Sequence, residues 1–184
     1  MEPINLRAHE DAFGRRINRG HSPALVYGVP WLSIMIGSLV PWLPVIAPAP
    51  VLPPLGFMLL IAWRFVRPGL LPLWAGLPLG LFDDLFSGQP LGSGILLFSL
   101  ALLAIEGLEM RFPWRTFLLD WVAAALLLLL YLAAAALLSG AALTLVQLVV
   151  IVPQLLLSIT VFPIIARMVG MLDRLRLMRM RRLG

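Results

Sequence analysis

The chain has 184 residues, 61% of them apolar when aromatic residues are counted, against about 45–50% in an average soluble domain. Charged residues make up 12%, about half of the usual ~25%, and residues 22–166 contain only nine of them. This composition excludes an ordinary water-soluble fold and favours a helical membrane domain. Cysteine is absent and the two histidines, His9 and His21, precede the first apolar stretch. We therefore expect no metal site and no cofactor.

Six apolar stretches are predicted to form transmembrane helices, at about 22–43, 55–66, 70–87, 91–108, 117–138 and 143–166. The second stretch is the shortest, because only nine residues separate the Pro53-Pro54 pair from Arg64. We expect Arg64 to extend its side chain to the membrane interface. The predicted organisation is an N-terminal segment (1–21), a six-helix membrane domain (22–166) and a basic C-terminal tail (167–184).

The basic residues predict the orientation of these helices. All 14 are arginines. They lie before the first stretch, between the second and third, between the fourth and fifth, and after the sixth, whereas the connections at 44–54, 88–91 and 139–142 have none. By the positive-inside rule both termini are cytoplasmic. The arginines that give the chain its +5 net charge are therefore expected to lie at the cytoplasmic membrane surface. There they would interact with lipid headgroups and not with nucleic acid.

The third stretch combines small residues with two acids. Pro72, Gly76, Gly80, Asp84 and Gly88 recur every four residues and so share one helix face. A glycine ridge of this kind allows another helix to approach closely. We expect Asp84 to point into protein, either as a partner or ligand contact or as a hydrogen-bond acceptor for the turn at residues 87–89. Asp83, about 100° away, is expected to reach the outer interface.

A polar stripe follows one face of the sixth stretch, and it includes Gln147, Gln154 and Ser158. Such side chains either hydrogen-bond to neighbouring helices or line a cavity for a solute, and the sequence leaves both alternatives open. Pro153 and Pro163 lie off this stripe, and each is expected to kink the helix or to leave a carbonyl without its helical donor.

The remaining acids near the fourth stretch have a simple interpretation. Glu106 and Glu109 precede Arg111 and Arg115, with which they are expected to form ion pairs at the cytoplasmic surface. No Gly-x-Ser-x-Gly, His-Glu-x-x-His or phosphate-binding loop occurs in the chain. An intramembrane enzyme would have to depend on these glutamates or on the two aspartates, so we expect no enzymatic activity.

Residues 67–92 resemble a segment of the bacterial rod shape-determining family MreD. In that family a basic-Pro turn leads into a helix that ends with a fixed pattern of glycine, aspartate, Ser-Gly and Pro-Leu-Gly. The positions of this chain that match it are Gly80, Asp84, Ser87, Gly88, Pro90, Leu91 and Gly92. Two positions differ, since Asp83 replaces an apolar residue and Gly94 stands where many members carry a polar residue or histidine.

The resemblance implies a six-helix fold related to the substrate-binding components of energy-coupling-factor transporters. It implies a non-enzymatic scaffold of the cell-elongation complex that binds the single-pass protein MreC. That complex also contains MreB, RodA and a penicillin-binding protein and supports peptidoglycan synthesis, and a homodimer is left open. The candidate structural or partner-contact residues are Gly76, Gly80, Asp84, Gly88, Pro90, Gly92, Gln147 and Gln154.

The alternative is a solute-binding membrane component of an energy-coupling-factor-type transporter. In its favour, Ala24 and Gly28 form a small-residue pair similar to the motif by which such components dock on their energising subunit. This pair is also common in membrane helices. Against the alternative, the short outer connections offer few polar side chains to a solute.

Overall fold

The structure is a computed structural model that describes residues 23–42, 52–112, 116–140 and 145–176. Across these ranges the chain is helical, and no strand occurs in them. The elements are α2 (Pro23–Ser38), η1 (Val40–Trp42), α3 (Leu55–Val66), η2 (Leu73–Ala75), α4 (Gly76–Ser87), α5 (Ser93–Arg111), α6 (Phe117–Leu138) and α7 (Leu145–Arg176). The all-helical class predicted from the sequence is confirmed.

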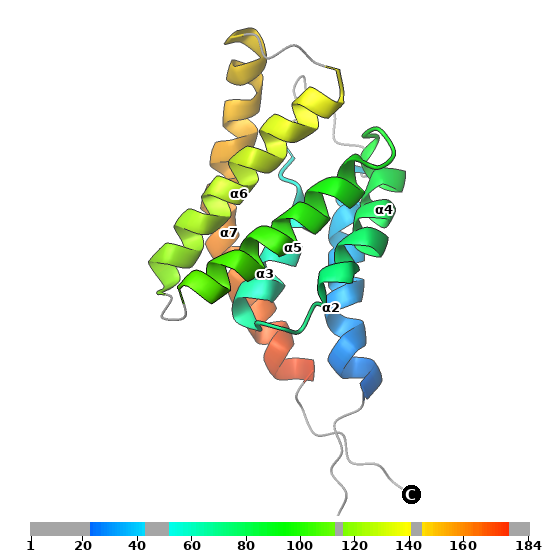
Figure 1. The fold of residues 1–184 in the computed structure, drawn as a ribbon, viewed down its shortest axis with the longest axis vertical. Helices are drawn as coiled ribbons and strands as arrows, with labels where there is room; N and C mark the ends of the chain where they lie inside the picture. The colour runs from blue at the N-terminus through cyan, green and yellow to red at the C-terminus, as the bar shows by residue number, and fades with distance from the viewer. Residues whose placement is uncertain (1–22, 43–51, 113–115, 141–144, 177–184) are drawn as a thin grey trace, which may run out of the picture.

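Successive helices run in opposite directions, so the start of α2 and the end of α7 lie at the same end of the bundle, the lower end in Figure 1. The basic residues follow this alternation. Arginines occupy the last turns of α3, α5 and α7, as Arg64, Arg111, Arg174 and Arg176, whereas the last turns of α2, α4 and α6 have none. The arginines of the described helix ends thus gather at one end of the bundle, which we call the arginine end.

Three of the helices are long and apolar enough to cross a membrane, namely α5, α6 and α7 over Ile151–Arg176. α2 and α4 are shorter than the sequence suggests, whereas α3 has its predicted bounds of 55–66. α3 begins directly after the Pro53-Pro54 pair, and α4 begins at Gly76 because the extended backbone at Pro72 and the short helix η2 (Leu73–Ala75) precede it. α7 in turn passes through the predicted boundary at residue 166 and continues to Arg176.

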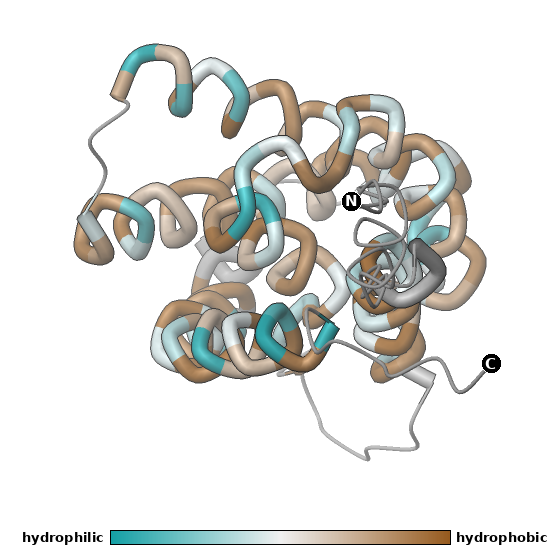
Figure 2. The backbone as a smooth tube through the Cα atoms, turned by 90° about the horizontal axis from the view of Figure 1, so that it is seen from below, coloured by the Kyte–Doolittle hydropathy of each residue, from teal (hydrophilic) through white to brown (hydrophobic). Residues whose placement is uncertain are grey.

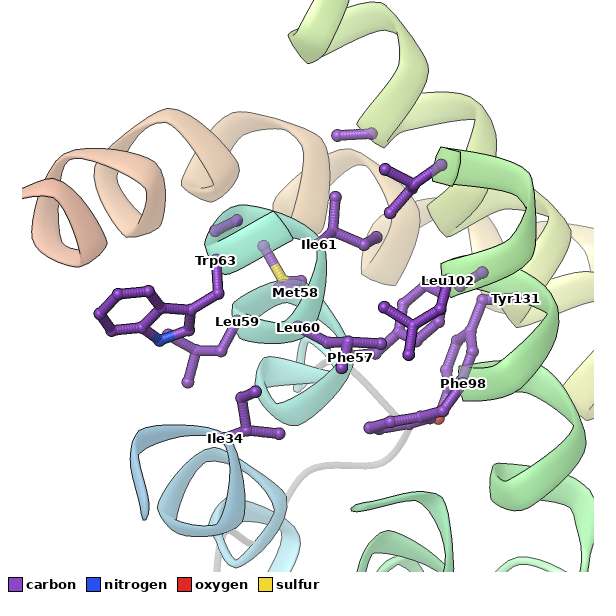
Figure 3. Packing of buried hydrophobic residues seen from close by; sticks show 14 of the residues in the cluster. Ile34, Phe57, Met58, Leu59, Leu60, Ile61, Trp63, Phe98, Leu102 and Tyr131 are labelled. Carbon is purple, nitrogen blue, oxygen red and sulfur yellow. The ribbon is translucent and has the colours of Figure 1, made fainter. Parts of the chain in front are cut away.

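α3 lies at the centre of the hydrophobic core, between α2, α5, α6 and α7 (Figure 3). Every residue from Gly56 to Arg64 is buried. The ring of Phe57 stacks on Tyr131 of α6 with 4.1 Å between centroids and meets the edge of Phe98 of α5 at 5.5 Å. A helix that is apolar on all sides is stable only where it is surrounded by apolar groups, and here the surrounding groups belong to the protein.

The longer helices consist mostly of apolar residues, which are brown in Figure 2, and their outward faces also carry exposed apolar side chains. Large exposed side chains on these faces include Leu100 on α5, Leu126 on α6 and Leu156 on α7. Exposed apolar surface on this scale is typical of helices in contact with lipid.

The common location of the arginines generates a prediction about membrane orientation. Alkaline phosphatase fused after Gln89 or Gly140 should be active, because these residues lie at the end of the described bundle opposite the arginine end and that end should face the periplasm. The same enzyme fused after Gly69 should be inactive. Activity after Gly69 would contradict an orientation in which the arginine end faces the cytoplasm.

Candidate functional site

The carboxylate of Asp84 binds the first turn of α5. Asp84 lies in the last turn of α4, and only a short connection separates it from the start of α5. Its Oδ2 accepts hydrogen bonds from the backbone N–H of Gly92 at 2.8 Å and of Ile95 at 3.4 Å. Its Oδ1 accepts from the N–H of Gly94 at 2.6 Å and from the Ser93 hydroxyl at 3.1 Å. Both oxygens are therefore occupied by donors of α5.

This arrangement satisfies N–H groups that have no partner within α5. The first N–H groups of any helix lack an intrahelical acceptor, and the partial positive charge at that end favours an anion. Asp84 is only 4% exposed, so its negative charge is stabilised chiefly by these donors. The prediction that Asp84 serves the turn at residues 87–89 is therefore corrected. That turn has a weaker contact of its own, from the N–H of Gln89 to the Ser87 hydroxyl at 3.5 Å.

The glycine ridge of α4 faces α5. A Cβ atom added to Gly76 would lie 2.8 Å from the backbone of Ser99. At Gly80 it would collide with the carbonyl of Gly94, and a Cβ on Gly94 would lie 2.7 Å from both the Gly80 oxygen and Asp84 Oδ1. Contacts below 3.0 Å essentially never occur for real Cβ atoms. These three glycines are thus required for space, because the backbones of α4 and α5 touch.

Gly88 and Gly92 have a different requirement. Their φ angles are +69° and +99°, and a Cβ on either residue would meet no atom within 4 Å. They end α4 and start α5 in the left-handed conformation that glycine adopts at little cost. Between them, the carbonyl of Pro90 accepts from the N–H of Ser93 at 3.0 Å and from its hydroxyl at 2.7 Å. The connection from Gly88 to Gly92 is therefore a compact turn that places the start of α5 next to Asp84.

Asp83 does not reach the outer interface, in contrast to its predicted position, and is only 6% exposed. Its carboxylate lies near the start of α3, where a Cβ added to Gly56 would be 3.1 Å from Asp83 Oδ1 and would collide with the Ser38 hydroxyl. The reason is that α4 packs against α2 as well as α5, so both acidic positions of its last turn face protein. Gly56 gave no periodic signal in the sequence.

Arg64 does not extend to the interface, because it forms ion pairs inside the protein and is only 3% exposed. Its guanidinium pairs with Glu106 and, at 3.0 Å, with Glu109, both on α5, and donates to the carbonyl of Leu71 at 2.8 Å. The two glutamates were predicted to pair with Arg111 and Arg115. Arg64 reaches both glutamates because α3 and α5 pack together, whereas Arg115 lies outside the described residues.

The polar stripe of α7 contributes one long-range hydrogen bond. The Gln154 amide donates to the carbonyl of Leu52, ahead of α3, at 2.6 Å. Ser158 is fully buried and donates to the Gln154 carbonyl within its own helix at 2.6 Å. For Gln154 the geometry favours the inter-element hydrogen bond over a cavity lining. The side chain of Gln147 lies outside the described residues. In the described part of the chain no three His, Cys, Asp or Glu residues gather to hold a metal ion.

These observations define a helical membrane protein with a carboxylate that joins two helices at a glycine-rich contact. The family model described as rod shape-determining protein MreD matches residues 24–175. This match covers most of the chain, so the chain belongs to the MreD family and has a role in rod shape determination. No curated protein and no solved structure matches the chain significantly.

The glycine contact predicts a difference between two alanine substitutions. Gly80→Ala should sharply reduce the folded protein recovered from membranes, because its methyl group would overlap the Gly94 carbonyl. Gly107→Ala is the matched control, because Gly107 also lies in a helix and a Cβ there meets nothing within 4 Å. It should leave recovery unchanged or improve it, since alanine favours helix by about 1 kcal/mol over glycine. Equal recovery of both variants would contradict the close contact.

The Asp84 geometry predicts a graded response to substitution. Asp84→Asn retains one acceptor oxygen but turns an NH₂ group toward backbone donors, so the free energy of unfolding should fall by about 1–3 kcal/mol. Asp84→Leu should cost more, because the N–H groups of Gly92, Gly94 and Ile95 all lose the carboxylate, whereas the Ser93 hydroxyl keeps the Pro90 carbonyl as an acceptor. Thr116→Val is the control, since Thr116 caps α6 with a single exposed bond of 3.5 Å. Thermal unfolding in detergent measures all three, and an Asp84→Leu variant as stable as Thr116→Val would refute the assignment.

The Arg64 ion pairs predict a contrast with a neighbouring arginine. Arg64→Met should lower the free energy of unfolding by roughly 2–4 kcal/mol, because Glu106, Glu109 and the Leu71 carbonyl all lose the guanidinium that binds them. The loss is below that of a fully buried pair, since the Glu106 side chain is 39% exposed and water screens it. Arg111→Met, at an exposed site at the end of α5, should have little effect. Similar losses for both variants would show that Arg64 acts only as a surface charge.

Proposed function

We propose that the protein is a non-enzymatic scaffold of the cell-elongation complex in the bacterial inner membrane. In this proposal it binds the single-pass protein MreC and works with MreB, RodA and a penicillin-binding protein. Together they direct peptidoglycan synthesis so that the cell keeps its rod shape. The observation that carries the proposal is the match of residues 24–175 to the MreD family.

The interior chemistry of the described residues supports a structural use of its charged groups. The carboxylate of Asp84 accepts hydrogen bonds from four donors at the start of α5. The guanidinium of Arg64 donates hydrogen bonds to two glutamates and one backbone carbonyl. A catalytic acid or base needs free access to a substrate atom. Charged groups that are bound to neighbouring helices in this way are suited to fixing helix positions.

We further propose that all six helices cross or enter the bilayer, in a fold related to the substrate-binding components of energy-coupling-factor transporters. A 12-residue helix such as α3 or α4 rises about 18 Å, less than the ~30 Å hydrocarbon core. Non-helical backbone is tolerated at membrane depth where protein surrounds it. The central position of α3 and the packing of α4 between α2 and α5 supply such surroundings.

The exposed apolar faces of α5 and α6 suit contact with lipid or with the membrane helix of a partner. On α5, Leu96, Leu100 and Leu103 are exposed along one face. A single apolar helix such as the anchor of MreC would pack on such a face through van der Waals contacts. Lipids occupy the same surfaces when no partner is bound.

Affinity purification in mild detergent tests the proposal. The expected result is co-purification of MreC, identified by mass spectrometry, with the wild-type chain. A destabilised variant such as Gly80→Leu serves as the control for nonspecific recovery. Absence of MreC together with a tightly held small molecule would contradict the scaffold and favour the transporter component.

A further inference from the structure

Two helices of the bundle contain prolines that each remove a backbone hydrogen bond within the helix. Pro30 lies inside α2 and Pro163 inside α7. Proline has no N–H group, so the carbonyl four residues earlier loses its usual helical donor. The affected carbonyls belong to Val26 and Ile159. In an apolar environment an unpaired carbonyl costs several kcal/mol.

Each of these two carbonyls accepts a hydrogen bond from a side chain of another helix. The guanidinium of Arg176, at the end of α7, donates to the Val26 carbonyl at 2.7 Å. The indole N–H of Trp121, on α6, donates to the Ile159 carbonyl at 3.0 Å. In both pairs the donor reaches the carbonyl that the proline deprives of its helical partner.

Arg176 is held in place by several further groups at the arginine end. It is 5% exposed, its Nε donates to Asp173 at 2.7 Å, and its guanidinium lies 5.5 Å from the centre of the Trp63 ring. Asp173 also accepts from Arg67 at 3.0 Å. Arg176 is therefore a buried cation with a carboxylate, an aromatic face and a backbone carbonyl as partners, not a solvated tail residue.

Trp63 connects the same site to the proline turn of α2. Its indole N–H donates to the Ser33 hydroxyl at 2.8 Å, and Ser33 donates to the carbonyl of Pro30 at 2.8 Å. The distorted turn of α2 is thus contacted from α3 through Trp63 and from α7 through Arg176. These contacts join residues 150 positions apart in the chain.

We propose that Pro30 and Pro163 create interhelical sockets, and that Arg176 in the Val26 socket is a latch that fixes the end of α7 to the start of α2. This inference goes beyond the scaffold function and does not depend on it. The latch is a conformational device, because its release would let the two ends of the described bundle separate at the arginine end. Trp121 in the Ile159 socket fastens α6 to α7 in the same manner.

The latch makes an unusual prediction for Pro30→Ala. Alanine restores an N–H at position 30, which competes with Arg176 for the Val26 carbonyl. Pro30→Ala should therefore loosen the end of α7 while the thermal midpoint of unfolding stays constant or rises, since alanine favours helix. Arg176→Met should loosen the same end and lower the midpoint by about 3–6 °C, because the Val26 carbonyl loses its donor and Asp173 loses one of its two arginine partners.

Electron-spin distance measurements test the latch in the full chain. The chain has no cysteine, so Tyr27→Cys and Leu175→Cys, both at exposed sites, would carry the only two labels. We expect a narrow distance distribution in the parent and in the control Arg174→Met, which removes an exposed arginine of the same turn. Arg176→Met and Pro30→Ala should both broaden it. An unchanged, narrow distribution in Pro30→Ala would overturn the proposal.

A double-substitution cycle tests the second socket. Trp121→Phe should lower the thermal midpoint by about 2–4 °C in the parent, because the Ile159 carbonyl loses its donor. In the Pro163→Ala background, where alanine supplies the helical N–H, the same substitution should have at most half that effect. An equal effect in both backgrounds would show that Trp121 acts only through packing, and it would overturn the socket at Ile159.

Discussion

The binding of the Asp84 carboxylate to the first turn of α5 is the interaction on which the organisation of the described bundle depends. It requires that α4 and α5 approach until their backbones touch, and glycine at 76, 80 and 94 makes that approach possible. It also requires the tight turn that Gly88 and Gly92 permit. α5 then places Phe98 against α3 and its glutamates against Arg64. Residues 67–92, which resemble the MreD family pattern, therefore form the connection that fixes α4 against α5.

Local spacing allowed part of this joint to be predicted from the sequence. Glycines every four residues indicate a close helix contact whatever the partner helix is, and an acid on the same ridge is expected to face protein. The arginine distribution indicated one charged end, which the last turns of α3, α5 and α7 share. The actual partner of Asp84 was not predicted. Nothing in the periodicity of α4 says that α5 returns to within hydrogen-bonding distance.

An apolar helix surrounded by protein and an apolar helix surrounded by lipid have similar sequences. This similarity explains why the sequence did not predict the burial of Arg64 inside the bundle. α3 is apolar on every side because protein encloses it, whereas α6 is apolar largely because most of its surface is not covered by the bundle. Arg64 was expected to escape to the interface, yet the packing of α3 on α5 brings it two carboxylates. The donors to the Val26 and Ile159 carbonyls could not be predicted from the sequence either. A proline shows which carbonyl loses its helical donor but not which side chain binds that carbonyl.

Amide hydrogen exchange at the start of α5, measured by NMR in detergent or nanodiscs, tests the central claim most directly. The N–H groups of the first turn of an ordinary helix have no acceptor and exchange quickly. If Asp84 binds them, the N–H groups of Gly92 and Gly94 should exchange as slowly as those in the middle of α5, and Asp84→Leu should accelerate both. Rapid exchange of these two amides in the parent protein would contradict the account.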